Sequence, residues 1–175
     1  MPEVDPIATC VLRQPKVEDA AKIWQLVIDS GVLDRNSAYL YLLLCRDFRN
    51  TCLVAERAGA VVGFVSGYRL PSNPAVLFVW QIGVHSSARR QGLALQMLRR
   101  LIANAGHAVQ FVEATVSASN RPSRRLFESL ARDLGCSLID EAGFDEALFP
   151  NGDHEAEPRI RIGLIPAAES AVDAD

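Results

Sequence analysis

Residues 80–94 read Trp-Gln-Ile-Gly-Val-His-Ser-Ser-Ala-Arg-Arg-Gln-Gly-Leu-Ala and join two different segments. Their first part belongs to an almost wholly apolar run over 76–84, which predicts a central strand covered on both faces. Their last part opens an amphipathic helix over 93–105. A strand that leads through a glycine turn into a helix N-terminus offers unpaired N–H groups and a positive dipole end to a pyrophosphate. A plain basic helix start would give the same Arg-x-x-Gly-x-Ala string, so the local pattern leaves both interpretations open.

Working outward from this segment, strands and helices alternate along the chain, which predicts a mixed α/β domain without repeats. Strands are expected over 10–13, 51–56, 61–68, 76–84, 111–116 and 160–165, the second and third forming a hairpin. Helices are expected from residue 19 to about 31, through 39–48, and over 93–105 and 121–134. Asn36 or Ser37 can cap the second helix, the segment 70–74 breaks the chain, and the last nine residues form a loose tail.

Composition narrows the function classes. The 175 residues predict one domain, with a core over about 10–166, and the formal charge of −3 argues against a dedicated nucleic-acid binder. No apolar stretch approaches the roughly 20 residues that cross a membrane, and no signal peptide is recognisable, so we expect a cytoplasmic protein. Cys10, Cys45, Cys52 and Cys136 are too scattered for a metal site and are expected to be reduced core thiols.

The order of elements, the segment 80–94 and Asn120 at the start of a later helix together resemble the GNAT N-acyltransferase family over about 12–165. The resemblance implies an α/β (α+β) fold with a mixed, mostly antiparallel sheet of six to seven strands flanked by helices. It further implies that strands 4 and 5 splay apart around acetyl-CoA, which is a co-substrate, and that no metal is needed. The cofactor-binding residues that it implies are Ile82, Gly83, Val84, Arg89, Arg90, Gln91, Gly92, Leu93, Ala94, Asn120, Ser123 and Phe127.

Two positions depart from the family pattern. Arg90 stands where many members have glycine, a variation that the pattern tolerates. Phe127 stands where many members have the tyrosine that protonates the departing thiolate, and phenylalanine has no proton to donate. Either another acid such as Tyr39, Tyr41 or a water serves, or the thiolate leaves directly. The sequence leaves these alternatives open.

Three further segments, 33–43, 65–71 and 77–81, with Ile23-Trp24 upstream, resemble one subfamily of these enzymes. That subfamily acetylates the 4-amino group of L-2,4-diaminobutyrate during synthesis of the compatible solute ectoine. The resemblance implies the products N4-acetyl-L-2,4-diaminobutyrate and CoA. It also implies small-molecule partners only, with no nucleic acid and no membrane, and a homodimer by analogy.

An amino-acid acceptor needs groups that bind its ammonium and its carboxylate. Candidate substrate-binding residues are Asp34, Asn36, Tyr39, Trp80, His154, Glu155 and Glu157. An aspartate in the loop at 31–35 can pair with the ammonium, whereas Asn36 is as easily a helix cap. Trp80 can wall the pocket or belong to the core. The segment 149–157 can close over the substrate or remain a solvated loop.

For catalysis we expect direct transfer in a ternary complex. The amine is deprotonated by Glu113, Asp34 or water, a strand amide near Ile82 stabilises the oxyanion, and Tyr39 is a candidate acid. Glu113 can equally be a buried salt-bridge residue. A route through an acetylated cysteine is the weaker hypothesis, because no histidine adjoins a cysteine. Two alternatives remain: a GNAT enzyme for another small amine, and a non-catalytic acyl-CoA-binding module.

Overall fold

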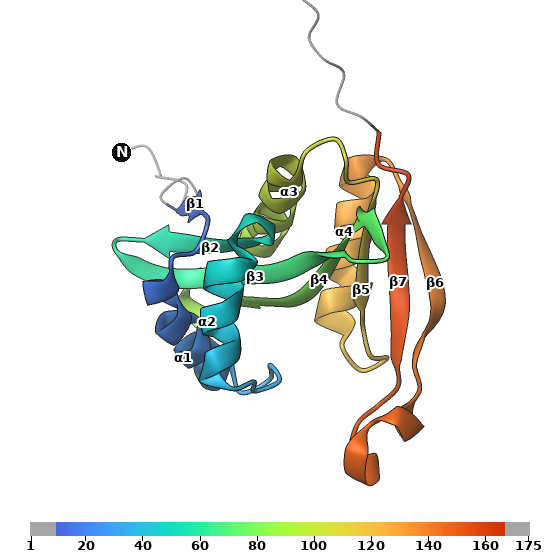
Figure 1. Cartoon of the computed structure of the whole chain (residues 1–175), viewed down its shortest axis with the longest axis horizontal. Helices are drawn as coiled ribbons and strands as arrows, with labels where there is room; N and C mark the ends of the chain where they lie inside the picture. The colour runs from blue at the N-terminus through green and yellow to red at the C-terminus, as the bar shows by residue number, and fades with distance from the viewer. Residues whose placement is uncertain (1–9, 167–175) are drawn as a thin grey trace, which may run out of the picture.

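The computed structural model describes residues 10–166, so the expected tail over 167–175 lies outside the described residues. Seven strands form one sheet in the order β1-β2-β3-β4-β5-β7-β6 (Figure 1). All neighbours are antiparallel except β4 and β5, which run parallel. The strands are β1 Val11–Arg13, β2 Cys52–Arg57, β3 Ala60–Leu70, β4 Asn73–Val84, β5 Phe111–Thr115, β6 Ser137–Phe144 and β7 Glu157–Gly163. This mixed, mostly antiparallel sheet is the predicted fold class.

Four helices cover the two faces of the sheet: α1 Ala20–Ser30, α2 Ala38–Asp47, α3 Leu93–Ala105 and α4 Arg121–Leu134. Helices α1 and α2 pack on one face around Val27, Tyr41 and Phe64. Helices α3 and α4 pack on the other, where Leu101 and Leu130 belong to a larger core. Each amphipathic helix buries its apolar stripe against the sheet, because that arrangement removes the stripe from water.

The helix ends follow local chemistry. Helix α1 ends at Gly31, whose φ of 68° is a left-handed conformation that glycine adopts at little cost. The hydroxyl oxygen of Ser37 accepts a hydrogen bond from the N–H of Leu40 and caps α2, so Ser37 rather than Asn36 fills that role. The side chain of Asn120 caps α4 by accepting from the N–H of Ser123 at 3.2 Å.

Strands β4 and β5 separate halfway along β4. Residues 76–78 of β4 pair with 111–113 of β5, whereas β4 continues to Val84 with β3 as its strand partner. The register of β3 against β4 shifts between Ser66 and Gly67, which leaves Trp80 as the extra residue of a β-bulge. The expected splay of strands 4 and 5 is therefore present.

Several expected boundaries need correction. Strand β6 was not predicted, because residues 137–144 mix polar and apolar side chains and most of them are exposed at the sheet edge. The expected break over 70–74 is only a two-residue turn, since β3 and β4 form a long hairpin around 71–72. Strand β7 begins at Glu157 rather than at residue 160. Cys45 and Cys52 are buried core thiols, but Cys10 and Cys136 are half-buried.

Within residues 10–166, no helix is long and apolar enough to cross a membrane. In the same range, no group of three or more histidine, cysteine, aspartate or glutamate side chains could hold a metal ion.

Candidate active site

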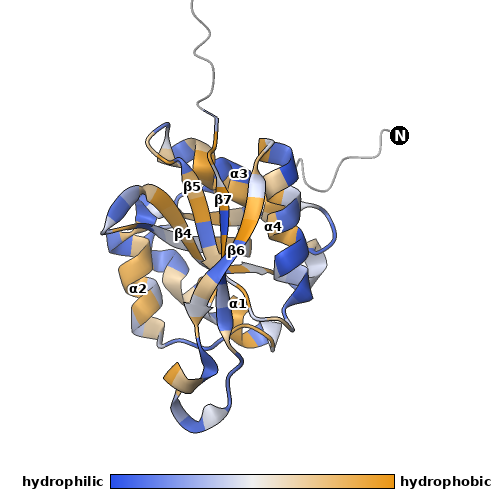
Figure 2. Ribbon diagram, turned by 90° about the vertical axis from the view of Figure 1, so that its right-hand side faces the viewer, coloured by the Kyte–Doolittle hydropathy of each residue, from blue (hydrophilic) through white to orange (hydrophobic). Residues whose placement is uncertain are grey.

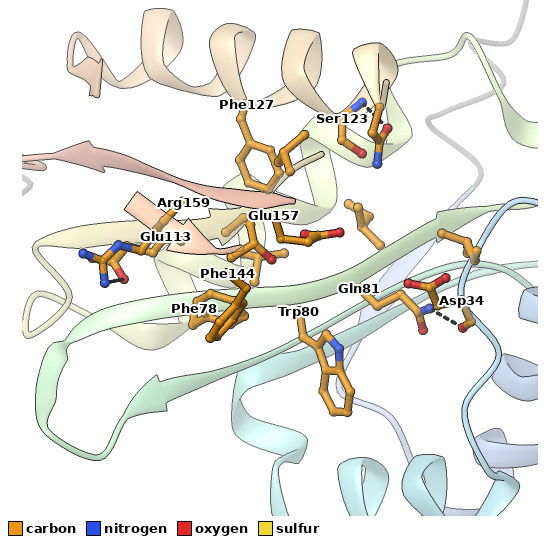
Figure 3. A pocket seen from close by; sticks show the side chains of 18 of the residues that line it. Asp34, Phe78, Trp80, Gln81, Glu113, Ser123, Phe127, Phe144, Glu157 and Arg159 are labelled. Atoms are coloured by element: carbon orange, nitrogen blue, oxygen red, sulfur yellow. Dashed lines mark hydrogen bonds and ion pairs between the residues drawn. The ribbon is translucent and has the colours of Figure 1, made fainter. Parts of the chain in front are cut away.

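A cleft of about 770 Å³ opens where β4 and β5 separate (Figure 3). Its walls come from the α1–α2 loop, β4, β5, the first turns of α4 and the hairpin of β6 and β7. On one wall, residues 79–84 of β4 have no strand partner on the β5 side. Their outward N–H and C=O groups need hydrogen-bond partners, so this edge can pair with an extended ligand. Ile82, the predicted oxyanion donor and pantetheine contact, lies on that wall.

A second cavity of about 330 Å³ lies at the turn between β4 and α3. Val84, Arg89, Arg90, Gly92, Leu93 and Ala94 line it, together with Leu126 and Ser129 of α4. Arg90 and Gly92 adopt left-handed φ values of 59° and 74°, so the chain turns sharply into α3. The first amides of α3 lack intrahelical acceptors and point their N–H groups toward this turn, which is the arrangement that suits an anion. Among the expected cofactor residues, Gly83 and Gln91 line neither cavity.

Two side chains of this turn are held by the protein itself. Arg89 donates from Nε to the carbonyl of Val84 at 3.0 Å, which folds it back onto the end of β4. Gln91 donates to the carbonyl of Ser87 and accepts from Arg57. Gln91 therefore shapes the turn, whereas the backbone around Gly92 faces the cavity.

One face of α4 forms the opposite wall of the cleft. Asn120, Ser123 and Phe127 all line it, because residues three and four apart in a helix share a face. The side-chain oxygen of Asn120 is occupied by the cap on Ser123. Phe127 is buried and presents an apolar ring to the cleft, with no proton to donate.

The loop between α1 and α2 forms another wall of the cleft, and a chain of side-chain hydrogen bonds, the polar relay, ties it to β4. The hydroxyl of Tyr41 donates to Oε1 of Gln81 at 2.8 Å, and Nε2 of Gln81 donates to the carbonyl of Asp34 at 2.9 Å. Asn36 donates to the Tyr41 hydroxyl at 3.4 Å. Burial raises the pKa of Tyr41, so it stays neutral. This relay fixes Asp34 at the cleft, and sequence reasoning missed it, although a lone glutamine in an apolar strand was the available sign.

The structure separates the expected aromatic candidates. Tyr39 is 65 % exposed on α2 and does not line the cleft, because it lies on another face of the helix from Tyr41. Trp80 is 44 % exposed and does line the cleft, so it is not a core residue. The bulge reorients the Trp80 side chain, and Figure 3 shows its ring on the side of β4 opposite to Phe127 and Ser123.

The connection between β6 and β7 places His154 at the cleft, close to Asp34. Nε2 of His154 lies 3.9 Å from Oδ2 of Asp34 and 3.9 Å from Oε1 of Glu157. Its ring stacks on Phe149 at 4.0 Å between centroids. The pKa of His154 is raised, first by a hydrogen bond with the carbonyl of Glu155 and then by the nearby Glu157 and Asp34 carboxylates. Asp34, His154 and Glu157 thus form an acidic cluster around one titratable ring.

The side chain of Glu155 points away from the cleft, toward the segment before α4. Its carboxylate accepts a hydrogen bond from the N–H of Ser119 at 3.2 Å, and Glu155 does not line the cleft. It ties the β6–β7 connection to the segment before α4. The expected substrate-binding role of Glu155 is therefore replaced in the structure by this tether.

Glu113 lies both in an ion pair and at the cleft wall. It is 2 % exposed, with Oε1 at 3.2 Å from Nε of Arg161 and Oε2 at 3.8 Å from Nη1 of Arg159. The salt-bridge alternative for Glu113 is thus observed. Arg159 also lines the cleft, and sequence reasoning did not single it out, because a cationic residue in an alternating strand is usually only solvated.

The cysteines lie away from the site. None of the four lines either cavity. Burial raises the pKa of Cys45 to about 12 and that of Cys52 to about 11, so both stay protonated thiols at neutral pH. Their environment does not suit a nucleophile.

Comparison with known proteins gives consistent matches. Residues 18–131 match the model of the Acetyltransferase (GNAT) family. The chain is 45 % identical over 158 residues to the L-2,4-diaminobutyric acid acetyltransferase of Halalkalibacterium halodurans, covering 90 % of this chain and 83 % of that protein. It is 43 % identical over 162 residues to the Nocardia farcinica protein of the same name, covering 92 % and 83 %.

A solved structure matches the whole fold as well. This structure is of the diaminobutyrate acetyltransferase EctA from Paenibacillus lautus with L-2,4-diaminobutyric acid and coenzyme A. It superposes with a TM-score of 0.86 at 44 % identity, covering 92 % of this chain and 98 % of that one. A more distant structure, Ard1 from Thermoplasma volcanium, has a TM-score of 0.72 at 17 % identity, covers 89 % and 99 %, and shares the fold.

Proposed function

The chain belongs to the GNAT acetyltransferase family, and on that premise we infer that it transfers the acetyl group of acetyl-CoA to the 4-amino group of L-2,4-diaminobutyrate. The products are N4-acetyl-L-2,4-diaminobutyrate and CoA, as required for ectoine synthesis. One observation supports this assignment most directly. The same cleft joins the unpaired edge of β4 and the face of α4 to the acidic cluster of Asp34, His154 and Glu157.

The two ends of the cleft bind different substrates. The thioester arm enters between β4 and α4, and the turn around Gly92 takes the pyrophosphate. The carboxylates of Asp34 and Glu157 attract the α-ammonium of the amino acid. The 4-amino group then points toward the thioester carbonyl beside Trp80 and Ile82. Holding both reactants in one cleft makes the reaction effectively unimolecular.

Transfer proceeds directly. The neutral 4-amine attacks the carbonyl carbon, and the oxyanion is stabilised by a free amide of β4 near Ile82. The C–N bond forms, the C–S bond breaks, and the amine proton passes through water to solvent. Because Phe127 has no proton to donate and the Tyr41 hydroxyl donates to Gln81, CoA leaves as a thiolate or takes a proton from water. Glu113, facing two guanidinium groups, is the less suitable base.

We also propose that the protein acts as a homodimer in the cytoplasm, where acetyl-CoA is available. The β6–β7 connection projects from the end of the sheet (Figure 2). Phe144 and Leu148 at this connection are 55 % and 69 % exposed, and Ile139 on the edge strand β6 is 52 % exposed; a second copy would cover this apolar surface. Sedimentation equilibrium should give twice the monomer mass; a monomer at micromolar concentration would contradict the dimer.

The experiment that tests the function compares CoA release with L-2,4-diaminobutyrate, ornithine, lysine, spermidine and an N-terminal peptide. We expect the highest kcat/KM with diaminobutyrate, and NMR of the product should show acetylation on the 4-amino nitrogen. A preference for another amine would assign the chain to that acceptor instead. Binding of acetyl-CoA without turnover on any amine would make it an acyl-CoA-binding module. Mass spectrometry of enzyme incubated with acetyl-CoA alone should find no acetylated cysteine.

A further inference from the structure

Arg159 is the only arginine or lysine that lines the cleft in the part of the chain that the structure describes. The cleft also holds three carboxylates, those of Asp34, Glu113 and Glu157. Such a balance suits a substrate with positive charge. An amino acid also has a carboxylate, and a carboxylate needs a cationic or N–H partner when it leaves water. Arg159 is the candidate for that partner.

Strand alternation places the side chain of Arg159 on the face of the sheet opposite to α3 and α4. Ile160 and Ile162 of β7 are buried in the core beneath α3 and α4, so Arg159 points to the opposite face. Directly across the strands, Arg159 stands opposite Thr115 of β5 and Glu141 of β6. Glu157 lies two residues earlier on the same strand and the same face, roughly 7 Å away along the backbone. A cation and an anion thus stand side by side at the cleft.

The guanidinium of Arg159 is held in place without having all its donors used. Nη2 lies 2.6 Å from Oε2 of Glu141, and Nη1 lies 3.8 Å from Oε2 of Glu113, which is beyond hydrogen-bond distance. Its Nε is buried and has no hydrogen-bond partner within the described residues. An arginine has five N–H donors in a planar fork, so this side chain retains donors for a further acceptor. Figure 3 shows Arg159 and Glu113 together at one end of the cleft.

We propose that Arg159 binds the α-carboxylate of the acceptor and thereby selects diamino acids over diamines. The proposal rests on the proposed function and adds the residue that determines this part of its specificity. Glu157 and Asp34 take the α-ammonium while Arg159 takes the carboxylate on the same carbon. The remaining 4-amino group is then the one that extends toward the thioester. Glu113 and Glu141 act as positioning residues that hold the guanidinium.

The test uses a substrate pair that differs only in the carboxylate: L-2,4-diaminobutyrate and 1,3-diaminopropane. In wild type, kcat/KM for diaminobutyrate should exceed that for diaminopropane by about 100-fold or more. In Arg159→Met, kcat/KM for diaminobutyrate should fall about 100-fold, whereas that for diaminopropane should stay within about threefold of wild type. Arg159→Lys should recover part of the selectivity, because it keeps the charge but loses the fork.

Arg161→Met is the matched control. Arg161 contacts the same Glu113 and stacks over Phe111 at 4.4 Å, but it does not line the cleft. Loss of the Arg161 ion pairs with Glu113 and Glu141 should therefore change the rates with both amines equally and leave the ratio of the two rates unchanged. A melting temperature that falls equally in both variants would report this structural effect. If Arg159→Met does not fold, the ratio of the two kcat/KM values in Arg159→Lys tests the proposal instead.

Two results overturn the inference while leaving the proposed function intact. One is equal loss of activity toward both amines in Arg159→Met. The other is a wild-type enzyme that acetylates diaminobutyrate without preferring it to diaminopropane. A wild-type protein that acetylates neither amine would instead overturn the proposed function, and with it this inference.

Discussion

The two halves of the cleft are built in different ways. The cofactor half comes from a nearly continuous stretch, residues 82–94, and one face of α4. It presents mainly backbone groups: an unpaired strand edge and the first amides of a helix. The acceptor half gathers Asp34, Trp80, His154, Glu157 and Arg159 from a loop, two strands and a hairpin connection. The backbone groups of the first half depend on turn geometry within one segment, whereas the side chains of the second half come from segments that only the whole fold brings together.

The bulge in β4 belongs to both halves. It turns Trp80 to the acceptor wall and lets the remainder of β4 diverge from β5 to form the cofactor wall. If the two halves are otherwise independent, changes in each should affect one substrate only. Changes at the bulge should affect both.

Gly67→Ala should have the largest effect on stability and activity, because Gly67 lies at the β-bulge that both halves share. A Cβ at Gly67 would lie 2.5 Å from the carbonyl oxygen of Phe78, so β3 and β4 must shift. We expect the free energy of unfolding to fall by about 3 kcal/mol and the KM for both substrates to rise. Urea denaturation and steady-state kinetics measure these effects. Gly63→Ala in the same strand is the control, since its Cβ would chiefly meet the flexible end of Met97.

Asp34→Asn should impair the acceptor half alone. Removing the carboxylate that attracts the ammonium should raise the KM for diaminobutyrate about 30-fold and leave the KM for acetyl-CoA unchanged. The Gln81 contact uses the backbone carbonyl of Asp34, so the loop should keep its place. Asp29→Asn, on the exposed side of α1, is the matched control. An equal rise in both KM values would show that the halves are not independent.

Gly92→Ala should impair the cofactor half alone. Alanine at a φ of 74° disfavours the turn that aims the first amides of α3, so the KM for acetyl-CoA should rise about tenfold. Gly135→Ala is a close control, because Gly135 has the same left-handed conformation, with φ 63° and ψ 28° at the end of α4, and lines neither cavity. Both variants should lose about 1 kcal/mol of stability. A similar rise in KM for both would argue against a cofactor turn at Gly92.

His154→Gln should have the smallest effect, confined to pH dependence. The raised pKa means that His154 is charged below that pKa and loses its charge as pH rises through it. The charged ring pairs with Asp34 and Glu157 and competes with the substrate ammonium. Between pH 8 and pH 6, the KM for diaminobutyrate in wild type should therefore rise about threefold relative to the variant. A constant ratio of the two KM values would exclude this competition.

The difference between the halves also explains which predictions succeeded. The helix starting at Leu93, the helix starting at Arg121 and the strand ending at Val84 were predicted, because apolar periodicity and glycine or asparagine at the ends are local features. Strand β6 was missed, since an exposed edge strand has no periodic apolar face. Of the predicted substrate-binding residues, Asp34 and Glu157 line the cleft, whereas Tyr39 and Glu155 do not.

The sequence by itself determined the order of the elements other than β6, the glycine turn before α3 and the family, because these depend on neighbours within a few residues and on a recognisable pattern. Only the tertiary structure decided that Tyr41 and Gln81 hold the Asp34 loop and that Glu113 is paired with two arginines. It also brought Arg159 to the cleft. These contacts join residues up to 48 positions apart, and their partners follow from strand register and helix packing rather than from local sequence.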